Sequence, residues 1–323
     1  MVALGDRDLT PHLSRRGDLS AEQRNSPAPQ HTAACACDDE PPDPDVRLAG
    51  NPALSPADLA RLTTHENPLV RWALAARPDL PRTACDRLAA DPVPGVRRDL
   101  AANPCVPEDV LRSLIADPYQ ETRRAVAHNP AVPLDLLADA AATCRVGPTL
   151  VPRVATATAA ELRLLAGSAV PAVRMLVAQR EDLPRDVLDR LAADPEPAVA
   201  KGVAVVPALS AGQLWALVHR HGTPLFPRVA LNPGCPPDLL HHLVTHAPAG
   251  HRTFREVATH PATSAATLLL CLRDERGRAA ASHPALPVDV LLTLLADPGT
   301  AEAAAANPAL PVSEMEKLLS PTT

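Results

Sequence analysis

The chain has 323 residues, a net charge of −6 and a pI of about 6.0, so the molecule as a whole offers no electrostatic attraction to nucleic acid. Hydrophobic residues make up 46% of the chain but aromatic residues only 2%, which argues against one large core built on aromatic rings. A chain of this composition fills many thin layers with Leu, Val and Ala instead. The 38 prolines recur at fixed intervals and therefore indicate repeats rather than disorder.

The first 20 residues contain no continuous apolar run of the kind that a secretory signal requires. No window reaches the roughly 18 apolar residues that cross a bilayer. The seven cysteines are odd in number and widely scattered. Together these features predict a cytoplasmic protein with no membrane partner.

Residues 1–41 are polar and rich in Pro, Ser and Asp, which predicts a disordered N-terminal arm. Cys35 and Cys37 lie within this arm, close to His31 and Asp38. Two thiolates provide at most half of a metal site. These cysteines are therefore weak candidate metal ligands, and we expect no cofactor.

Residues 42–320 contain a repeat whose anchor is the proline of Asn-Pro or its equivalent. The first four anchors follow one another at steps of 26 residues, and later steps are 23 to 28 residues. The 51 residues between Pro130 and Glu181 leave room for two repeats with one degenerate anchor. The spacing predicts about eleven repeats. The anchors are Pro52, Pro78, Pro104, Pro130, Glu181, Pro207, Pro233, Pro261, Pro284 and Pro308.

A short helix is predicted in the first half of each repeat. An apolar residue follows the anchor by two positions, and then comes a proline or serine with an acidic residue close behind, a pattern typical of helix starts. Apolar residues seven and ten positions after the anchor form one buried stripe. These pairs are Leu59 and Leu62, Leu111 and Leu114, Leu188 and Leu191, Leu214 and Leu217, Leu240 and Leu243, and Leu291 and Leu294.

A second short helical segment follows an Asp-Pro such as Asp91-Pro92 or Asp117-Pro118, because the residue before a proline is forced out of the helical region. Segments 96–102 and 122–128 are examples. Three residues before each next anchor lies an alanine, which predicts close packing of two backbones. These alanines are Ala49, Ala75, Ala101, Ala127, Ala178, Ala204, Ala230, Ala258, Ala281 and Ala305.

No alternating β-branched runs or Asn-Gly turns are present, so the sequence predicts no strands. A single repeat of this kind cannot bury its apolar stripe alone, and stacking supplies the burial. The predicted fold is therefore an all-α solenoid. Residues 139–170 lack both the Asp-Pro and the Asn-Pro and predict a bend or local irregularity.

The repeat is clearest at residues 103–128, NPCVPEDVLRSLIADPYQETRRAVAH, and it resembles the leucine-rich repeat variant family over roughly residues 43–319. The resemblance implies alternating α- and 3-10-type helices wound into a right-handed superhelix. One type of member carries an iron–sulfur cluster in a cysteine-rich module before the repeats. A cluster normally needs four thiolates, whereas this chain has only Cys35 and Cys37 there. This shortage of cysteines argues against a cluster, and an iron–sulfur redox or sensor protein is kept only as an alternative to the scaffold.

Three other cysteines, Cys85, Cys235 and Cys271, occupy apolar positions of the repeat and are expected in the core. Six of the twelve histidines lie within 219–251. His242 and His246 are four residues apart and share a helix face, as in zinc-binding helices, but no acidic base lies between them. A solvated polar face is the favoured interpretation of this cluster.

A row of arginines lies in the second segments. Four of them are seven residues before the next anchor, and two others follow directly. One interpretation is a set of ion pairs with Asp91 or Asp117, six residues upstream, tying neighbouring repeats together. The other is a basic stripe for acidic protein segments or phosphates. The candidate binding residues are Arg71, Arg97, Arg98, Arg123, Arg124 and Arg174.

The sequence contains no nucleophile elbow, phosphate-binding loop or metal-hydrolase helix. Solenoids usually bind macromolecules, so we expect a monomeric, non-enzymatic scaffold that binds a protein partner through its curved surface. The alternative to a protein partner is a nucleic-acid-binding solenoid that uses the arginine row.

Overall fold

The computed structural model describes residues 44–319 of the chain. The predicted N-terminal arm and its two cysteines, Cys35 and Cys37, lie outside the described residues. The chain divides into two units, Met1–Pro44 and Asp45–Thr323, and the description below concerns the second. Its described residues form helices and connecting turns without any strand, which confirms the predicted all-α solenoid.

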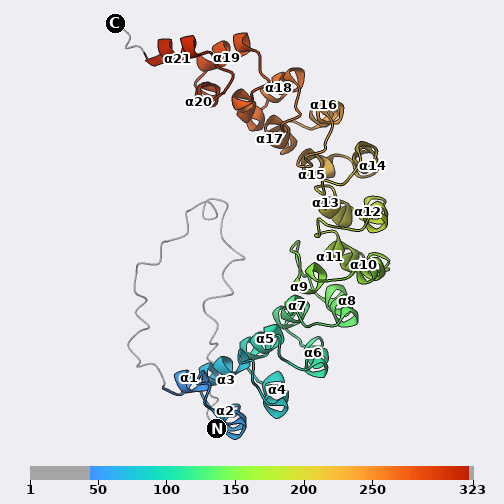
Figure 1. Ribbon diagram of the computed structural model, residues 1–323, viewed down its shortest axis with the longest axis vertical. Helices are drawn as coiled ribbons and strands as arrows, with labels where there is room; N and C mark the ends of the chain where they lie inside the picture. The colour runs from blue at the N-terminus through green and yellow to red at the C-terminus, as the bar shows by residue number, and fades with distance from the viewer. Residues whose placement is uncertain (1–43, 320–323) are drawn as a thin grey trace, which may run out of the picture. The chain divides into compact units, whose positions relative to one another are not determined.

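Each repeat contributes a first and a second helix, and these two kinds of helix form two rows (Figure 1). Row A contains the first helix of each repeat. Its members are α2 (Pro56–Leu62), α4 (Arg82–Ala89), α6 (Glu108–Leu114), α8 (Leu134–Thr143), α10 (Ala159–Ala166), α12 (Arg185–Ala192), α14 (Ala211–His221), α16 (Pro237–His246), α18 (Ala265–Cys271), α19 (Val288–Leu295) and α21 (Val312–Leu319).

Row B contains the second helix of each repeat. Most of these helices pack on their row neighbours, as α5 does on α3 and α7. The members are α1 (Pro44–Ala49), α3 (Pro68–Ala75), α5 (Pro94–Ala102), α7 (Gln120–His128), α9 (Pro152–Ala155), α11 (Pro171–Val177), α13 (Pro197–Val203), α15 (Phe226–Ala230) with η2 (Thr223–Leu225) before it, α17 (Thr253–Ala258), η3 (Glu275–Ser282) and α20 (Ala301–Ala305).

Most second segments are short α-helices. Among the described residues only η2 and η3 are 3-10 helices, so the alternation of α and 3-10 that the family resemblance implies is limited to the C-terminal part. Several row B helices start with proline at one of the first two helical positions, as at Pro94 and Pro197, but α7, α17, η3 and α20 do not. In row A the prolines Pro81 and Pro107 are instead N-cap residues with extended backbone, one position earlier than predicted.

The core follows the predicted register. The first leucine of every predicted pair is buried, and the nine alanines from Ala49 to Ala281 that precede an anchor by three residues are buried as well. The prediction is wrong for Ala305, which is exposed, while Ala304 is buried instead. No row B helix follows α20 among the described residues, so the outer side of Ala305 lacks the layer that covers its equivalents.

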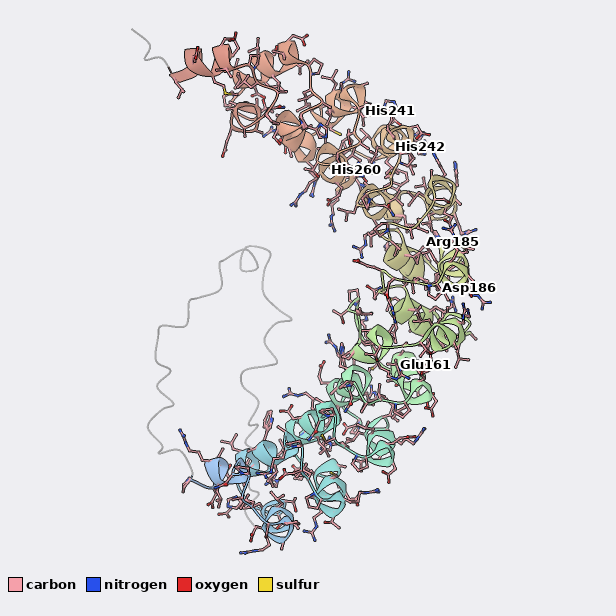
Figure 2. All side chains as sticks on the ribbon, in the orientation of Figure 1. Glu161, Arg185, Asp186, His241, His242 and His260 are labelled. Carbon is pink, nitrogen blue, oxygen red and sulfur yellow. The ribbon has the colours of Figure 1, made fainter. Side chains whose placement is uncertain are left out.

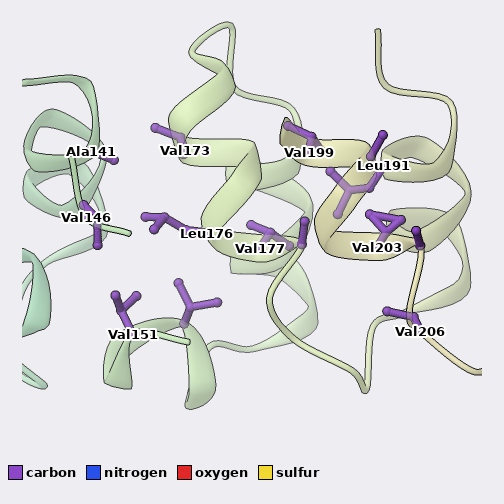
Figure 3. Packing of buried hydrophobic residues seen from close by; sticks show 14 of the residues in the cluster. Ala141, Val146, Val151, Val173, Leu176, Val177, Leu191, Val199, Val203 and Val206 are labelled. Atoms are coloured by element: carbon purple, nitrogen blue, oxygen red, sulfur yellow. The ribbon is translucent and has the colours of Figure 1, made fainter. Parts of the chain in front are cut away.

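The irregular stretch predicted at 139–170 is a repeat in which α8 is extended and α9 is a single turn of four residues. Because α9 is so short, α11 packs directly on α8. The loop between α8 and α9 still contributes to the core through Val146 and Val151, which lie near Leu176 of α11 (Figure 3). The two repeats expected between Pro130 and Glu181 are therefore both present.

Candidate functional site

Three arginines of row B form ion pairs with the repeat that follows. Each Nε donates to an aspartate 20 residues downstream, at 2.6 Å for Arg71–Asp91, 2.5 Å for Arg97–Asp117 and 2.6 Å for Arg174–Asp194. The Nη2 atom donates to the other carboxylate oxygen in each pair, at 3.0 to 3.2 Å. We call these three bidentate pairs the arginine ladder.

The arginine ladder ties neighbouring repeats, as expected, but the predicted partner was wrong. The residue six positions upstream offers its backbone carbonyl instead: Arg97 Nη1 donates to Asp91 O at 2.5 Å. The Asp91 carboxylate accepts the amide N–H of Val93 and so turns toward Arg71 of the preceding repeat. The Asp91 carboxylate therefore accepts hydrogen bonds both from the amide N–H of its own turn and from the arginine of the preceding repeat.

The ladder pairs are charged and buried. Asp91, Asp117 and Asp194 are all at most 7% exposed, and their arginines lie beside them with little more exposure. Burial raises the pKa of Asp117, but the hydrogen bonds from Arg97 and the amide N–H of Tyr119 outweigh it and leave the pKa below 3.8. Arg71, Arg97 and Arg174 are thus engaged in ion pairs within the fold, which fits the structural interpretation of the arginine row better than a free basic stripe.

Arg123 has the ladder position but lacks the ladder partner. Its Nη1 donates to the backbone carbonyls of Asp117 and Pro118, as in the paired arginines. Its Nε is buried and has no hydrogen-bond partner among the described residues. The residue 20 positions downstream is Thr143, which is exposed and donates its hydroxyl to the carbonyl of Asp139 at 2.9 Å.

A cavity of about 540 Å³ opens at this irregular repeat. It is lined by Gln120 from α7, by residues 141–146 at the end of α8, and by Ala172 and Met175 from α11. Burial raises the pKa of the lining residue Cys144, the charges of Arg123 and Arg124 act in the opposite direction, and the charge of Glu121 adds a smaller upward contribution. The cavity is therefore close to both arginines, and none of its lining residues is acidic.

Arg98 and Arg124, the remaining two candidates, belong to a set that recurs six residues before the anchor, on the row B surface. All of its members are partly or fully exposed. Arg98 lies 5.4 Å from the centre of the Trp72 ring and pairs with Asp99 at 2.7 Å. The same position also holds Val46, Pro227 and Glu302; we call the other members the exposed row, which comprises Trp72, Arg98, Arg124, Met175, Lys201, Arg255 and Arg278.

Three cations of the exposed row, Arg124, Lys201 and Arg255, form no ion pair within residues 44–319. On row A the charges are instead matched between repeats. Its cross-repeat pairs are Arg82–Asp109, Arg112–Asp135 and Arg163–Asp186. Figure 2 labels Arg185 and Asp186, which belong to α12 of row A. Row A therefore pairs part of its surface charge between repeats, although its exposed Arg87 and Arg190 form no ion pair within residues 44–319, and the exposed row keeps three such cations.

Sequence reasoning missed a second set of contacts between repeats, made by the asparagine of Asn-Pro. Asn129 is fully buried, and its Nδ2 donates to Ala101 O and Asn103 O of the preceding repeat at 2.8 and 2.9 Å. Its Oδ1 accepts the amide N–H of Ala131. The recurrence of Asn before the anchor was the available signal. We call this set the asparagine ladder; it comprises Asn103, Asn129, Asn232 and Asn307.

The histidine cluster is an aromatic stack. The His242 and His246 rings lie 4.0 Å apart and nearly parallel, which confirms the shared helix face, and Trp215 lies 5.0 Å from His242. Burial, with His246 and His219 nearby, lowers the pKa of His242. Residues 44–319 contain no group of three or more His, Cys, Asp or Glu side chains arranged to hold a metal ion.

The three cysteines predicted in the core are buried. Burial raises the pKa of Cys235 and of Cys271 to about 12, so both remain thiols at neutral pH. Cys105 is exposed, and Cys144 is half-buried beside the cavity.

Comparison with known proteins gives little further guidance. No protein-family model and no curated protein matches the chain. A crystal structure of an engineered protein, a Northeast Structural Genomics Consortium target, is 15% identical with a TM-score of 0.27, over 81% of this chain and 92% of that one. None of the helices within residues 44–319 has the length and apolar character needed to cross a membrane.

Proposed function

We propose that this protein is a non-enzymatic scaffold that binds an acidic segment of a partner protein along the exposed row. The observation that carries the proposal is the difference between the two helix rows. Row A pairs part of its surface charge across repeats, whereas Arg124, Lys201 and Arg255 of row B share one position of their repeats and form no ion pair within residues 44–319. Arginine and lysine in such a row attract carboxylates even though the whole chain has a net charge of −6.

The spacing of the repeats supports an extended partner. Packed helices lie about 8–10 Å apart, and an extended chain advances about 3.3 Å per residue. About three partner residues therefore pass each repeat. A segment with an acidic residue at every third position would meet Arg98, Arg124 and their equivalents in turn. Trp72 and Met175 in the same row add apolar contact area.

The same proposal includes membership of the leucine-rich repeat variant family, on the strength of the repeat at 103–128, and action as a cytoplasmic monomer. A nucleic acid would compete for the same cations, and its binding would weaken steeply as salt is added. We favour a protein because the exposed row interleaves cations with apolar side chains.

The test is affinity capture with the intact chain and two charge-reversed variants. The first changes Arg98, Arg124 and Lys201 to Glu on row B. The matched control changes Arg61, Arg87 and Arg190, all exposed on row A, to Glu. We expect the row B variant to lose its partner and the row A variant to retain it, after nuclease treatment of both. Recovery of the same partners by both variants would overturn the proposal.

A further inference from the structure

We infer that the unpaired Arg123, with the cavity beside it, is a dedicated binding site for one carboxylate of the partner, either an Asp or Glu side chain. This inference rests on the proposed function and assigns its most specific contact. In other repeats the corresponding place is filled from within the chain, by Asp91, Asp117 or Asp194.

The guanidinium of Arg123 is already held in the orientation of a carboxylate receptor. Its Nη1 is fixed by the carbonyls of Asp117 and Pro118. In Arg97 the same fixation leaves Nε and Nη2 to form a bidentate pair with a carboxylate. A bidentate arginine–carboxylate pair is strong and geometrically specific. Arg123 therefore presents a preformed fork with a buried Nε that has no acceptor.

The local sequence explains why the chain supplies no carboxylate here. After α6, Asp117 precedes Pro118, which ends the helix and leaves the aspartate in the turn. At the equivalent place Thr143 precedes Cys144, and without a proline α8 continues to Thr143. The helix extension carries Thr143 outward, where it is exposed, and the 144–151 loop lies beside the cavity. This repeat therefore lacks both the aspartate that would pair with Arg123 and the proline that would end the helix before it.

The surroundings favour an anion. Arg145 lines the cavity, and Arg124 is close enough to the loop that a Cβ on Gly147 would lie 3.7 Å from its Nη2. The lining also includes apolar Val146, Ala172 and Met175, which suit the methylene groups of a glutamate. The cavity volume lies in the range of small-ligand sites. A buried N–H without a partner is costly, so a carboxylate that accepts from Arg123 Nε would be stabilised there.

The experiment uses the intact protein and a fluorescein-labelled pentaglutamate peptide with blocked ends, followed by fluorescence anisotropy. Arg123→Lys retains the charge but removes the fork, and Arg124→Lys is the same change one residue along. We expect Arg123→Lys to weaken binding by about tenfold or more, the factor that a charge-assisted hydrogen bond provides, and Arg124→Lys to change it much less. Equal affinities of the two variants would overturn the inference.

A second variant fills the site from within. Thr143→Asp with Cys144→Pro restores the Asp-Pro of the regular repeats, and we expect it to bind the pentaglutamate peptide at least about tenfold more weakly than the wild type. Unchanged binding would contradict the inference. A blocked pentaglutamine peptide and a pentaalanine peptide with a free C-terminus distinguish side-chain carboxylates from a terminal one; preference for the terminal carboxylate contradicts the side-chain assignment. Binding of tripolyphosphate in place of the peptide contradicts it also.

The two proposals fail in different ways. If the Glu variant at Arg98, Arg124 and Lys201 loses the peptide while Arg123→Lys retains it, the carboxylate site is wrong and the exposed row stands. If neither variant changes the capture of a partner, the proposed function fails together with the site.

Discussion

Arg97 and Arg123 lie one repeat apart at the same position of the repeat. Comparing them distinguishes an arginine that is paired within the fold from one whose Nε has no acceptor among the described residues. Each guanidinium holds a backbone carbonyl six residues upstream. Arg97 then meets the carboxylate of Asp117, whereas the Nε of Arg123 meets no acceptor among the described residues. Identical arginines in one repeat pattern therefore have different roles, and the residues 20 positions downstream decide which role each has.

The same comparison shows how little change produces an irregular repeat. Where Thr143-Cys144 takes the place of Asp-Pro, α8 is longer, α9 is a single turn, and a cavity lies beside them. After this region Arg180 occupies the position of the asparagine and donates to Val154 O and Ala157 O of the preceding repeat. The stack of repeats is continuous even where the arginine ladder is interrupted.

The largest effect is expected for Asp117→Ala, which leaves Arg97 charged and buried without its partner. Loss of one member of a buried pair costs about 3–5 kcal/mol of unfolding free energy. Urea unfolding followed by circular dichroism measures it. Thr143→Ala at the equivalent position of the irregular repeat is the control, and an effect as large as that of Asp117→Ala would show that the arginine ladder is not what distinguishes the two repeats.

A smaller effect is expected for Asn129→Ala, which removes two buried hydrogen bonds to the preceding repeat and the cap of its own turn. Unpaired carbonyls cost about 1–3 kcal/mol. Asn51→Ala is a matched control, because Asn51 is exposed and its side chain accepts the amide N–H of Ala53 without a donor bond to another repeat within residues 44–319. Equal shifts of the urea midpoint in the two variants would contradict a role of the asparagine ladder in coupling repeats.

The smallest effect is expected for the loss of folding stability at low pH. The pKa values of Asp117 and Asp194 are lowered in the fold, since arginine and amide hydrogen bonds outweigh burial. Their stabilising contribution is therefore complete above the unfolded pKa near 3.8 and is lost as the pH falls through the lower folded pKa. In the irregular repeats, the hydrogen bond from Arg153 and the capping contacts with Thr158 lower the pKa of Glu161 to about 2.

The acid prediction is checked by thermal unfolding between pH 6 and pH 2. We expect the wild type to lose stability below about pH 4. Asp117→Asn with Asp194→Asn should flatten this decline, and Glu161→Gln should remove a smaller part that persists to lower pH. A decline that all variants share unchanged would show that other carboxylates control acid unfolding.

Much of the fold could be predicted because burial in a stacked array repeats with the sequence. Leu111, Leu188 and Cys235 are buried where their positions in the repeat indicated. Ala305 could not be placed correctly, because its exposure depends on the missing layer beyond it. The arginines were found, but the partner of Arg97 was not, since the direction in which Asp117 turns depends on a backbone N–H within the Asp-Pro turn.

The sequence alone determined the helical class, the two-helix repeat, the apolar stripe and the irregular stretch, because these depend on local periodicity and on proline breaks. Only the tertiary structure decided which charges are paired between repeats, since residues 20 to 28 positions apart meet through stacking and not through helical spacing. It also decided that Arg123 lacks an acceptor and that the cavity lies beside it. Whether a buried N–H finds an acceptor depends on which atoms surround it in the folded chain, and the spacing of residues along the sequence does not determine this.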